Sequence, residues 1–61
     1  MVVYFRIEIT YTNMFAQADI NRVLIVDDDP MDLKQYWKFS TWITDDGQTL
    51  VSLRSAWNNN L

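Results

Sequence analysis

The sequence predicts an α+β fold, in which a small and mainly antiparallel β-sheet packs with one or two short helices. Three observations lead to this fold class. Apolar and polar residues alternate over residues 3–12, a turn sequence at 45–47 separates two strand-like segments, and a helix-start pattern stands at Asp29-Pro30. An all-β arrangement is the alternative, because the helical segment is short and needs tertiary support.

The N-terminal segment, residues 3–12, has the two-residue period of a strand with one buried face. The face expected to be buried carries Phe5, Ile7, Ile9 and Tyr11, and the polar face carries Tyr4, Arg6, Glu8 and Thr10. Residues 14–21 fit either a short helix or a loop, since Phe15 and Ala18 give only one helical repeat. The β-branched run at 23–26 predicts a short second strand, although it also fits the end of a helix begun at Asn13.

A helix is predicted over residues 30–37. Asp29 is placed to be its N-cap, Pro30 its first residue, and Asp32 a favourable charge in its first turn. Leu33 and Trp37 follow at helical spacing and are expected to pack on one face of the sheet.

The C-terminal third predicts a β-hairpin, with strands at 39–44 and 48–57 around Asp45-Asp46-Gly47. A two-residue loop mixes polar and apolar residues on both faces. A three-residue loop with Gly47 as a bulge pairs Phe39 with Leu53 and gives a coherent apolar face, so this register is preferred. That apolar face carries Trp37, Phe39, Thr41, Ile43, Val51 and Leu53. The other face carries Lys38, Ser40, Trp42, Leu50, Ser52 and Arg54.

The size and composition of the chain indicate one small domain and argue against catalysis. The chain has 61 residues, and we expect a single domain over 1–57 with a frayed polar tail at 58–61. Cysteine and histidine are both absent, so the chain has neither disulfides nor a Cys–His or Ser–His pair. We expect no enzyme activity and no cofactor.

The charge of the chain bears on its partners. Eight acidic and five basic residues give a net charge of −3, which disfavours direct binding of nucleic acid and fits a partner with a basic surface. Arg6 stands among the first six residues, and no long apolar run follows, so we expect neither a signal peptide nor a membrane span. A cytoplasmic location is the expectation.

The best candidate contact surface is the hairpin face that presents Trp42 and Leu50 between Lys38 and Arg54. Tryptophan and arginine are the residue types that most often carry interface energy. Exposed strand edges in so small a sheet also favour a homo-oligomer. The alternative is that a helix covers this face and Trp42 is part of the core.

A second candidate is the acidic cluster of Asp27, Asp28, Asp29 and Asp32, with Asp45 and Asp46 expected to be near it in space. It is either a solvated, capped turn or a phosphate-like array for a basic groove. We therefore expect a small, non-enzymatic interaction protein with a basic or apolar protein partner. Its size and composition favour a phage or mobile-element inhibitor of a host nucleic-acid-handling protein, of the anti-CRISPR or anti-restriction type, acting in the host cytoplasm.

One segment carries a family resemblance. Residues 22–30 read Arg-Val-Leu-Ile-Val-Asp-Asp-Asp-Pro, which resembles the opening of a response-regulator receiver domain. The resemblance implies that Asp27 and Asp28 help to hold Mg²⁺ beside a phosphoacceptor aspartate. A receiver-like, Mg-binding turn in a truncated or divergent signalling module is therefore the alternative function. The EF-hand pattern is absent, so we expect no complete metal cage.

Overall fold

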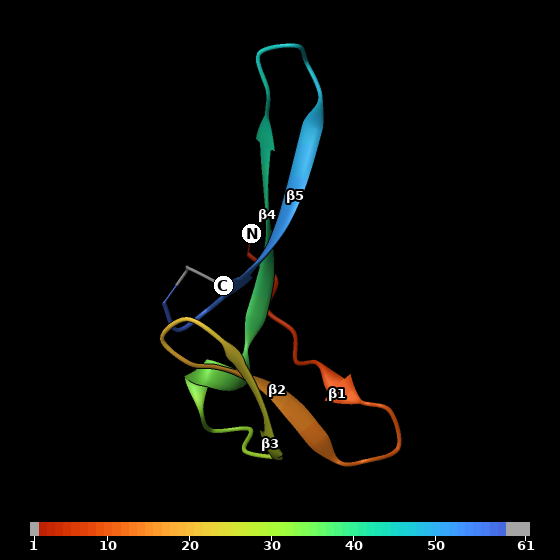
Figure 1. Ribbon diagram of the computed structural model, residues 1–61, viewed down its shortest axis with the longest axis vertical. Helices are drawn as coiled ribbons and strands as arrows, with labels where there is room; N and C mark the ends of the chain where they lie inside the picture. The colour runs from red at the N-terminus through yellow and green to blue at the C-terminus, as the bar shows by residue number, and fades with distance from the viewer. Residues whose placement is uncertain (1, 59–61) are drawn as a thin grey trace.

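The computed structural model describes residues 2–58, which form two antiparallel β-sheets and one short 3₁₀ helix (Figure 1). The first sheet has the strand order β1-β2-β3, with β2 in the centre. The second sheet is a hairpin of β4 and β5. The elements are β1 (Glu8–Ile9), β2 (Met14–Ala18), β3 (Val23–Asp27), η1 (Leu33–Gln35), β4 (Trp37–Ile43) and β5 (Thr49–Ser55).

The predicted α+β fold is wrong. Strands contain 47% of the described residues and helical structure 5%, with no helix of seven or more residues. The predicted helix over 30–37 is reduced to η1, because Tyr36 is extended at φ −108° and ψ 141° and Trp37 already pairs with Phe5. Asp32, and not Asp29, is the N-cap of η1, and its carboxylate accepts a 3.0 Å hydrogen bond from Lys34 N. Pairing of the Trp37 backbone with Phe5, which is distant in the sequence, thus replaces the end of the local helix.

The predicted strand over 3–12 is also interrupted, because the chain passes from one sheet to the other within it. Phe5 exchanges two backbone hydrogen bonds with Trp37 in β4, with N–O distances of 2.8 and 2.9 Å. Two residues later, Ile7 O accepts a 2.9 Å bond from Ala16 N in β2. The N-terminal segment therefore joins the two sheets.

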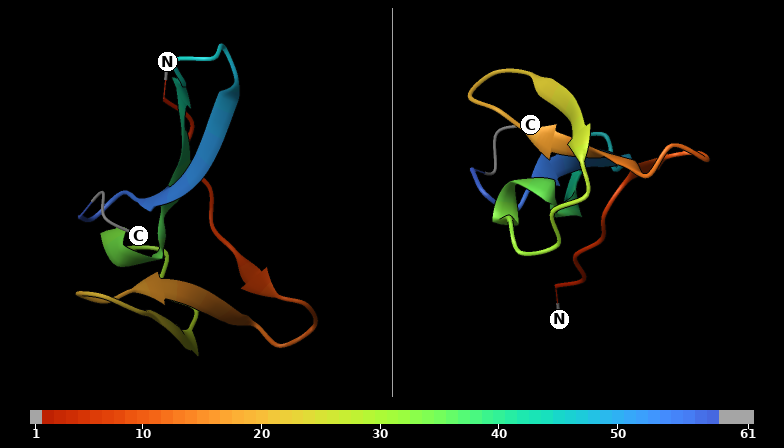
Figure 2. Two further views of the ribbon diagram at one scale, coloured as in Figure 1. Left: turned by 45° about the horizontal axis from the view of Figure 1, so that its top comes forward. Right: turned by 90° about the horizontal axis from the view of Figure 1, so that it is seen from below.

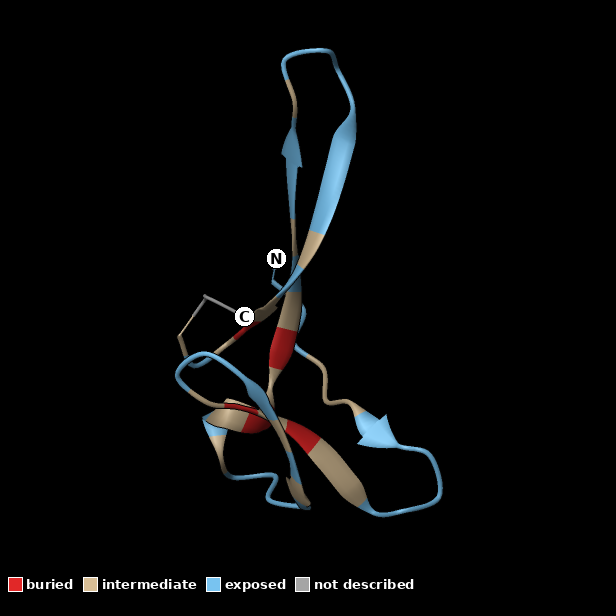
Figure 3. Cartoon of the chain, viewed as in Figure 1, coloured by how far each residue is buried: buried red, intermediate tan, exposed pale blue. Residues whose placement is uncertain are grey.

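The core lies where the two sheets meet (Figure 3). Trp37 is 1% exposed and packs with Ala16 and Ala18 of β2, while Phe5 and Ile7 pack against this cluster. The two small alanines leave room for the indole ring, and its Nε1 donates a 3.1 Å hydrogen bond to Ala16 O. The segment 14–21 was expected to be a short helix or a loop, but its first five residues form β2, which packs against Trp37, and 19–21 lie in the connection to β3.

Only two of the four residues expected on the buried face of the N-terminal segment are partly buried. Phe5 and Ile7 are half-buried, whereas Ile9 and Tyr11 are exposed. Tyr11 is 99% exposed and has a left-handed backbone with φ 65° in the turn between β1 and β2. Of the predicted strand over 3–12, only Glu8–Ile9 forms a strand, and Phe5 forms an isolated bridge.

The β4–β5 hairpin projects from the rest of the molecule as an arm (Figures 1 and 2). We call residues 38–54 the arm, and we call β1, β2, β3 and η1 the base. The chain measures 42 × 24 × 23 Å and has a radius of gyration of 13.2 Å. A compact chain of this length has a radius of gyration of about 10.5 Å. The arm therefore has little of the chain packed against it.

The turn of the arm has the predicted three-residue loop. Gly47 has φ 86°, Gly47 N donates to Thr44 O at 2.9 Å, and Thr44 N donates to Gln48 O at 2.8 Å. Phe39 is opposite Leu53, as the preferred register requires. The predicted register of the hairpin is therefore confirmed. Glycine at position 47 favours this loop, because glycine adopts a positive φ without strain.

The carboxylate of Asp46 is part of this turn. The Thr44 hydroxyl donates to it, Gln48 N–H donates to it at 3.4 Å, and these bonds hold the pKa of Asp46 below its ordinary value of 3.8. A depressed pKa gives stability that is present above pH 3.8 and lost as the pH falls below it. We expect Thr44→Val to raise the pKa of Asp46 toward 3.8, measured by an NMR titration of the carboxyl carbon. Ser40→Ala is the control, and an unchanged Asp46 in Thr44→Val would contradict this cause.

The C-terminal end is described only as far as Asn58, whose Nδ2 donates to Asp19 O at 3.4 Å. The rest of the predicted frayed tail, residues 59–61, lies outside the described residues. Over residues 2–58, no helix has the length and apolar character needed to cross a membrane.

Candidate functional site

The predicted contact residues of the hairpin lie together on one face of the arm. Trp42 is directly opposite Leu50, and Lys38 is directly opposite Arg54. The pair of serines at 40 and 52 separates these two cross-strand pairs. Trp42 is 46% exposed, and no helix covers this face in the described part of the chain. The face therefore presents an apolar pair toward the tip and a basic pair toward the base.

The opposite face of the arm is exposed too, which corrects the expectation that it packs on the core. Only the pair at the root of the hairpin, Trp37 and Ser55, is buried on this face, whereas Phe39 is 65% and Ile43 is 72% exposed. The reason is geometric, since the base is small and the arm extends beyond it (Figure 3). The arm therefore exposes apolar side chains on both faces, along most of this face and at the Trp42–Leu50 pair on the other.

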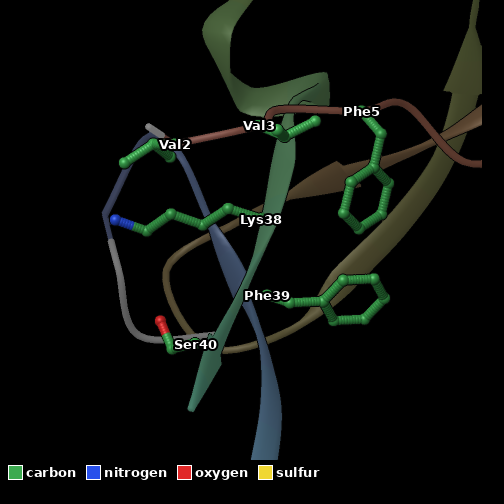
Figure 4. Close-up of a pocket in the computed structure, with 6 residues that line it drawn as sticks. All are labelled: Val2, Val3, Phe5, Lys38, Phe39 and Ser40. Atoms are coloured by element: carbon green, nitrogen blue, oxygen red, sulfur yellow. The ribbon is translucent and has the colours of Figure 1, made fainter.

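A hollow of 480 Å³ lies between the N-terminal segment and the outer edge of β4 (Figure 4). The rings of Phe5 and Phe39 are stacked on one side of it, with centroids 4.9 Å apart and planes tilted by 35°. Its lining is Val2, Val3, Phe5, Lys38, Phe39 and Ser40. The hollow is mainly apolar and has one cationic side chain at its rim.

At the other end of the molecule, a buried glutamine organises the acidic turn, which we define as residues 27–32. Gln35 is 1% exposed. Its Oε1 accepts hydrogen bonds from Arg6 Nη2 at 2.8 Å and from Asp29 N at 3.1 Å. Its Nε2 donates to Asp27 O at 2.9 Å and to Gln17 Oε1 at 3.3 Å. Sequence reasoning missed this residue, because glutamine is usually exposed and no spacing pattern marks it.

Arg6 completes this network. Its guanidinium forms an ion pair with Asp28 and lies over the ring of Phe15, 4.0 Å from the centroid. The Arg6 side chain thus lies within the base and not on the arm.

The four predicted acidic residues are brought together in the acidic turn, and three of them have partners within the chain. Asp28 pairs with Arg6, Asp29 Oδ1 accepts from Met31 N at 3.3 Å, and Asp32 caps η1. Asp45 and Asp46 were expected near this turn. They lie instead at the far tip of the arm (Figure 1). The acidic turn is thus a structured, internally bonded loop.

The acidic turn differs from the site that the receiver resemblance implies. β3 is an edge strand that pairs antiparallel with β2, and a single 3₁₀ turn follows it in place of a helix. Among residues 2–58, no group of three or more carboxylates is placed to hold a metal ion. Comparisons with protein-family models, curated proteins and solved structures find no match. The resemblance is limited to residues 22–30.

Proposed function

We propose that this chain is a non-enzymatic protein-binding module that docks on an apolar surface of another protein chain through the arm. The observation that carries the proposal is the exposure of large apolar side chains on both faces of a two-stranded hairpin. These side chains are Phe39, Trp42, Ile43, Leu50, Val51 and Leu53.

Two physical arguments support this reading. A two-stranded hairpin is at best marginally stable alone in water, and a third strand or a packed partner is normally needed. Contiguous apolar surface of this kind marks an interface more often than it marks free solvent contact. The arm presents its apolar residues on a two-stranded ladder, with Lys38 and Arg54 beside them as a polar rim.

The arm is favoured over the acidic turn as the docking surface because of how the carboxylates are used. Asp28, Asp29 and Asp32 already accept hydrogen bonds from Arg6, Met31 and Lys34. A phosphate-like array must instead direct its carboxylates at the partner. The more specific hypothesis of an inhibitor of nucleic-acid-handling proteins rests on size and composition, and salt dependence tests it.

Trp42→Ala is expected to remove partner binding while leaving the circular dichroism spectrum unchanged. The test is an affinity capture from a bacterial lysate with wild-type, Trp42→Ala and Met31→Ala baits, at low and raised salt. Met31 is the matched control, because it is exposed and apolar but lies outside the arm.

Each result of this capture has a clear meaning. Proteins held by wild type and Met31→Ala at both salt concentrations, and lost with Trp42→Ala, support docking through the arm. A partner released by salt and insensitive to Trp42→Ala points to the acidic turn and contradicts the proposal. Loss of the folded spectrum in Trp42→Ala also contradicts it, because Trp42 is then a core residue.

A further inference from the structure

Within the described residues, the outer edge of β4 has unpaired backbone groups, and the pairing of Trp37 with Phe5 shows which groups these are. Trp37 uses its N–H and C=O to bind Phe5, so these groups point away from β5. In an antiparallel ladder the direction alternates along the strand. Phe39, Thr41 and Ile43 therefore also direct their N–H and C=O groups outward.

The alternating direction of the β4 backbone groups also agrees with the hydrogen bonds at the tip of the arm. Thr44 N donates to Gln48 O at 2.8 Å, so this even-numbered residue faces β5 as expected. Phe5 occupies the edge at Trp37, and the turn begins at Thr44. The open edge runs over residues 38–43, and within the described chain no strand pairs with it.

We propose that two copies of this chain pair antiparallel through these β4 edges, with Thr41 opposite Thr41 of the second copy. Phe39 is then opposite Ile43 of the second copy, and every outward-facing residue of one edge meets an outward-facing residue of the other. The two hairpins become a four-stranded sheet, which satisfies the need of a hairpin for further strands. This inference rests on the proposed function, since it names a partner of the same arm.

The side chains agree with this register. Phe39 and Ile43 are the two most exposed apolar residues of β4, and the register places them side by side twice, once at each end of the shared edge. Ile43 of the second copy comes beside Phe39 at the mouth of the hollow lined by Val2, Val3 and Phe5 (Figure 4). A branched apolar side chain suits a hollow of this chemistry.

The charges also favour a second copy as the occupant. Lys38 comes opposite Thr44 of the second copy, directly beside Asp45 and Asp46 at its tip. Two-fold symmetry repeats this contact at the other end. The chain carries a net charge of −3, which opposes association of two copies in general, whereas this register places unlike charges together at both ends. The acids at the tip and the cation at the root of each arm are thus complementary to a second copy.

The test compares proline substitutions on the two edges of the arm, using the full chain and sedimentation velocity over a wide range of concentration. Thr41→Pro removes an outward N–H of β4, and Val51→Pro removes the N–H that the same alternation directs outward from β5. Thr41→Pro is expected to weaken the dimer by about tenfold or more, because symmetry removes two hydrogen bonds. Val51→Pro is expected to leave it unchanged.

The opposite pattern, or a wild-type chain that stays monomeric, overturns the proposal. If Thr41→Pro does not fold, the proposal is tested by exchanging the charges of Lys38 and Asp45. Lys38→Glu is expected to weaken the dimer, and the double variant Lys38→Glu/Asp45→Lys is expected to restore it. Equal association of wild type and both charge variants also overturns the register.

Failure of this inference is distinct from failure of the proposed function. Pairing through the edge leaves both faces of the sheet accessible, so the Trp42 surface stays open in the dimer. A monomeric wild type that still captures a Trp42-dependent partner retains the proposed function and rejects the dimer. A dimer sensitive to Thr41→Pro, with no Trp42-dependent partner, retains the dimer alone.

Discussion

Gln35→Leu is expected to lower the free energy of unfolding by about 2–4 kcal/mol, because it removes four hydrogen bonds from a buried position at nearly constant side-chain volume. Gln35 is 1% exposed, and its amide connects Arg6, Gln17 and the backbone of the acidic turn. Leucine leaves Asp27 O and Asp29 N without these partners. Urea denaturation followed by circular dichroism measures the change.

Gln48→Leu is the matched control, since it makes the same replacement at an exposed glutamine of the arm and is expected to change stability by less than about 0.5 kcal/mol. Gln35→Glu separates the two halves of the network. It retains acceptors for Arg6 and Asp29 N but loses the two bonds that the Nε2 group donates. If Gln35→Leu unfolds at the wild-type urea concentration, the network does not stabilise the base.

The hairpin is the part of the fold that local chemistry determines. Asp45-Asp46-Gly47 needs a residue with positive φ, and glycine at position 47 selects the three-residue loop. That loop sets the register, and the register places Trp42 opposite Leu50. The candidate contact face could therefore be predicted, because each step depends on residues close in sequence.

The elements that were predicted wrongly depend on contacts between distant residues. The segment 30–37 has good helix-start signals, yet Trp37 pairs with Phe5 and its indole packs on β2. The free energy of burying that ring outweighs a short helix of marginal stability. No local pattern indicates that Phe5 leaves one sheet and Ile7 joins the other.

The acidic turn illustrates the same limit in the candidate site. The four aspartates are neighbours in the sequence and lie in one turn, but three of them already accept hydrogen bonds, from Arg6, Met31 N and Lys34 N. Whether a carboxylate is available to a partner depends on these bonds, and charge counting does not reveal them. The exposure of the two tryptophans of β4 could not be predicted either. The sequence does not show how much of the arm the base covers, and Trp37 is buried whereas Trp42 is 46% exposed.

Trp37→Ala is expected to leave the chain largely unfolded, whereas Trp42→Ala is expected to change stability by less than about 1 kcal/mol. Trp37 is 1% exposed, and it joins the sheets through its ring, its indole N–H and its backbone pair with Phe5. Truncating a buried tryptophan to alanine lowers the free energy of unfolding by about 3–5 kcal/mol. A chain of this size has a total stability of about 3–9 kcal/mol, and a core made of Trp37 and two alanines places this chain near the lower end, so the loss removes most of it. Trp37→Phe retains an aromatic ring but leaves Ala16 O without the indole donor, and we expect a loss of about 1–2 kcal/mol. Urea denaturation by circular dichroism measures all three variants, and equal losses in Trp37→Ala and Trp42→Ala would show that the arm packs on the base.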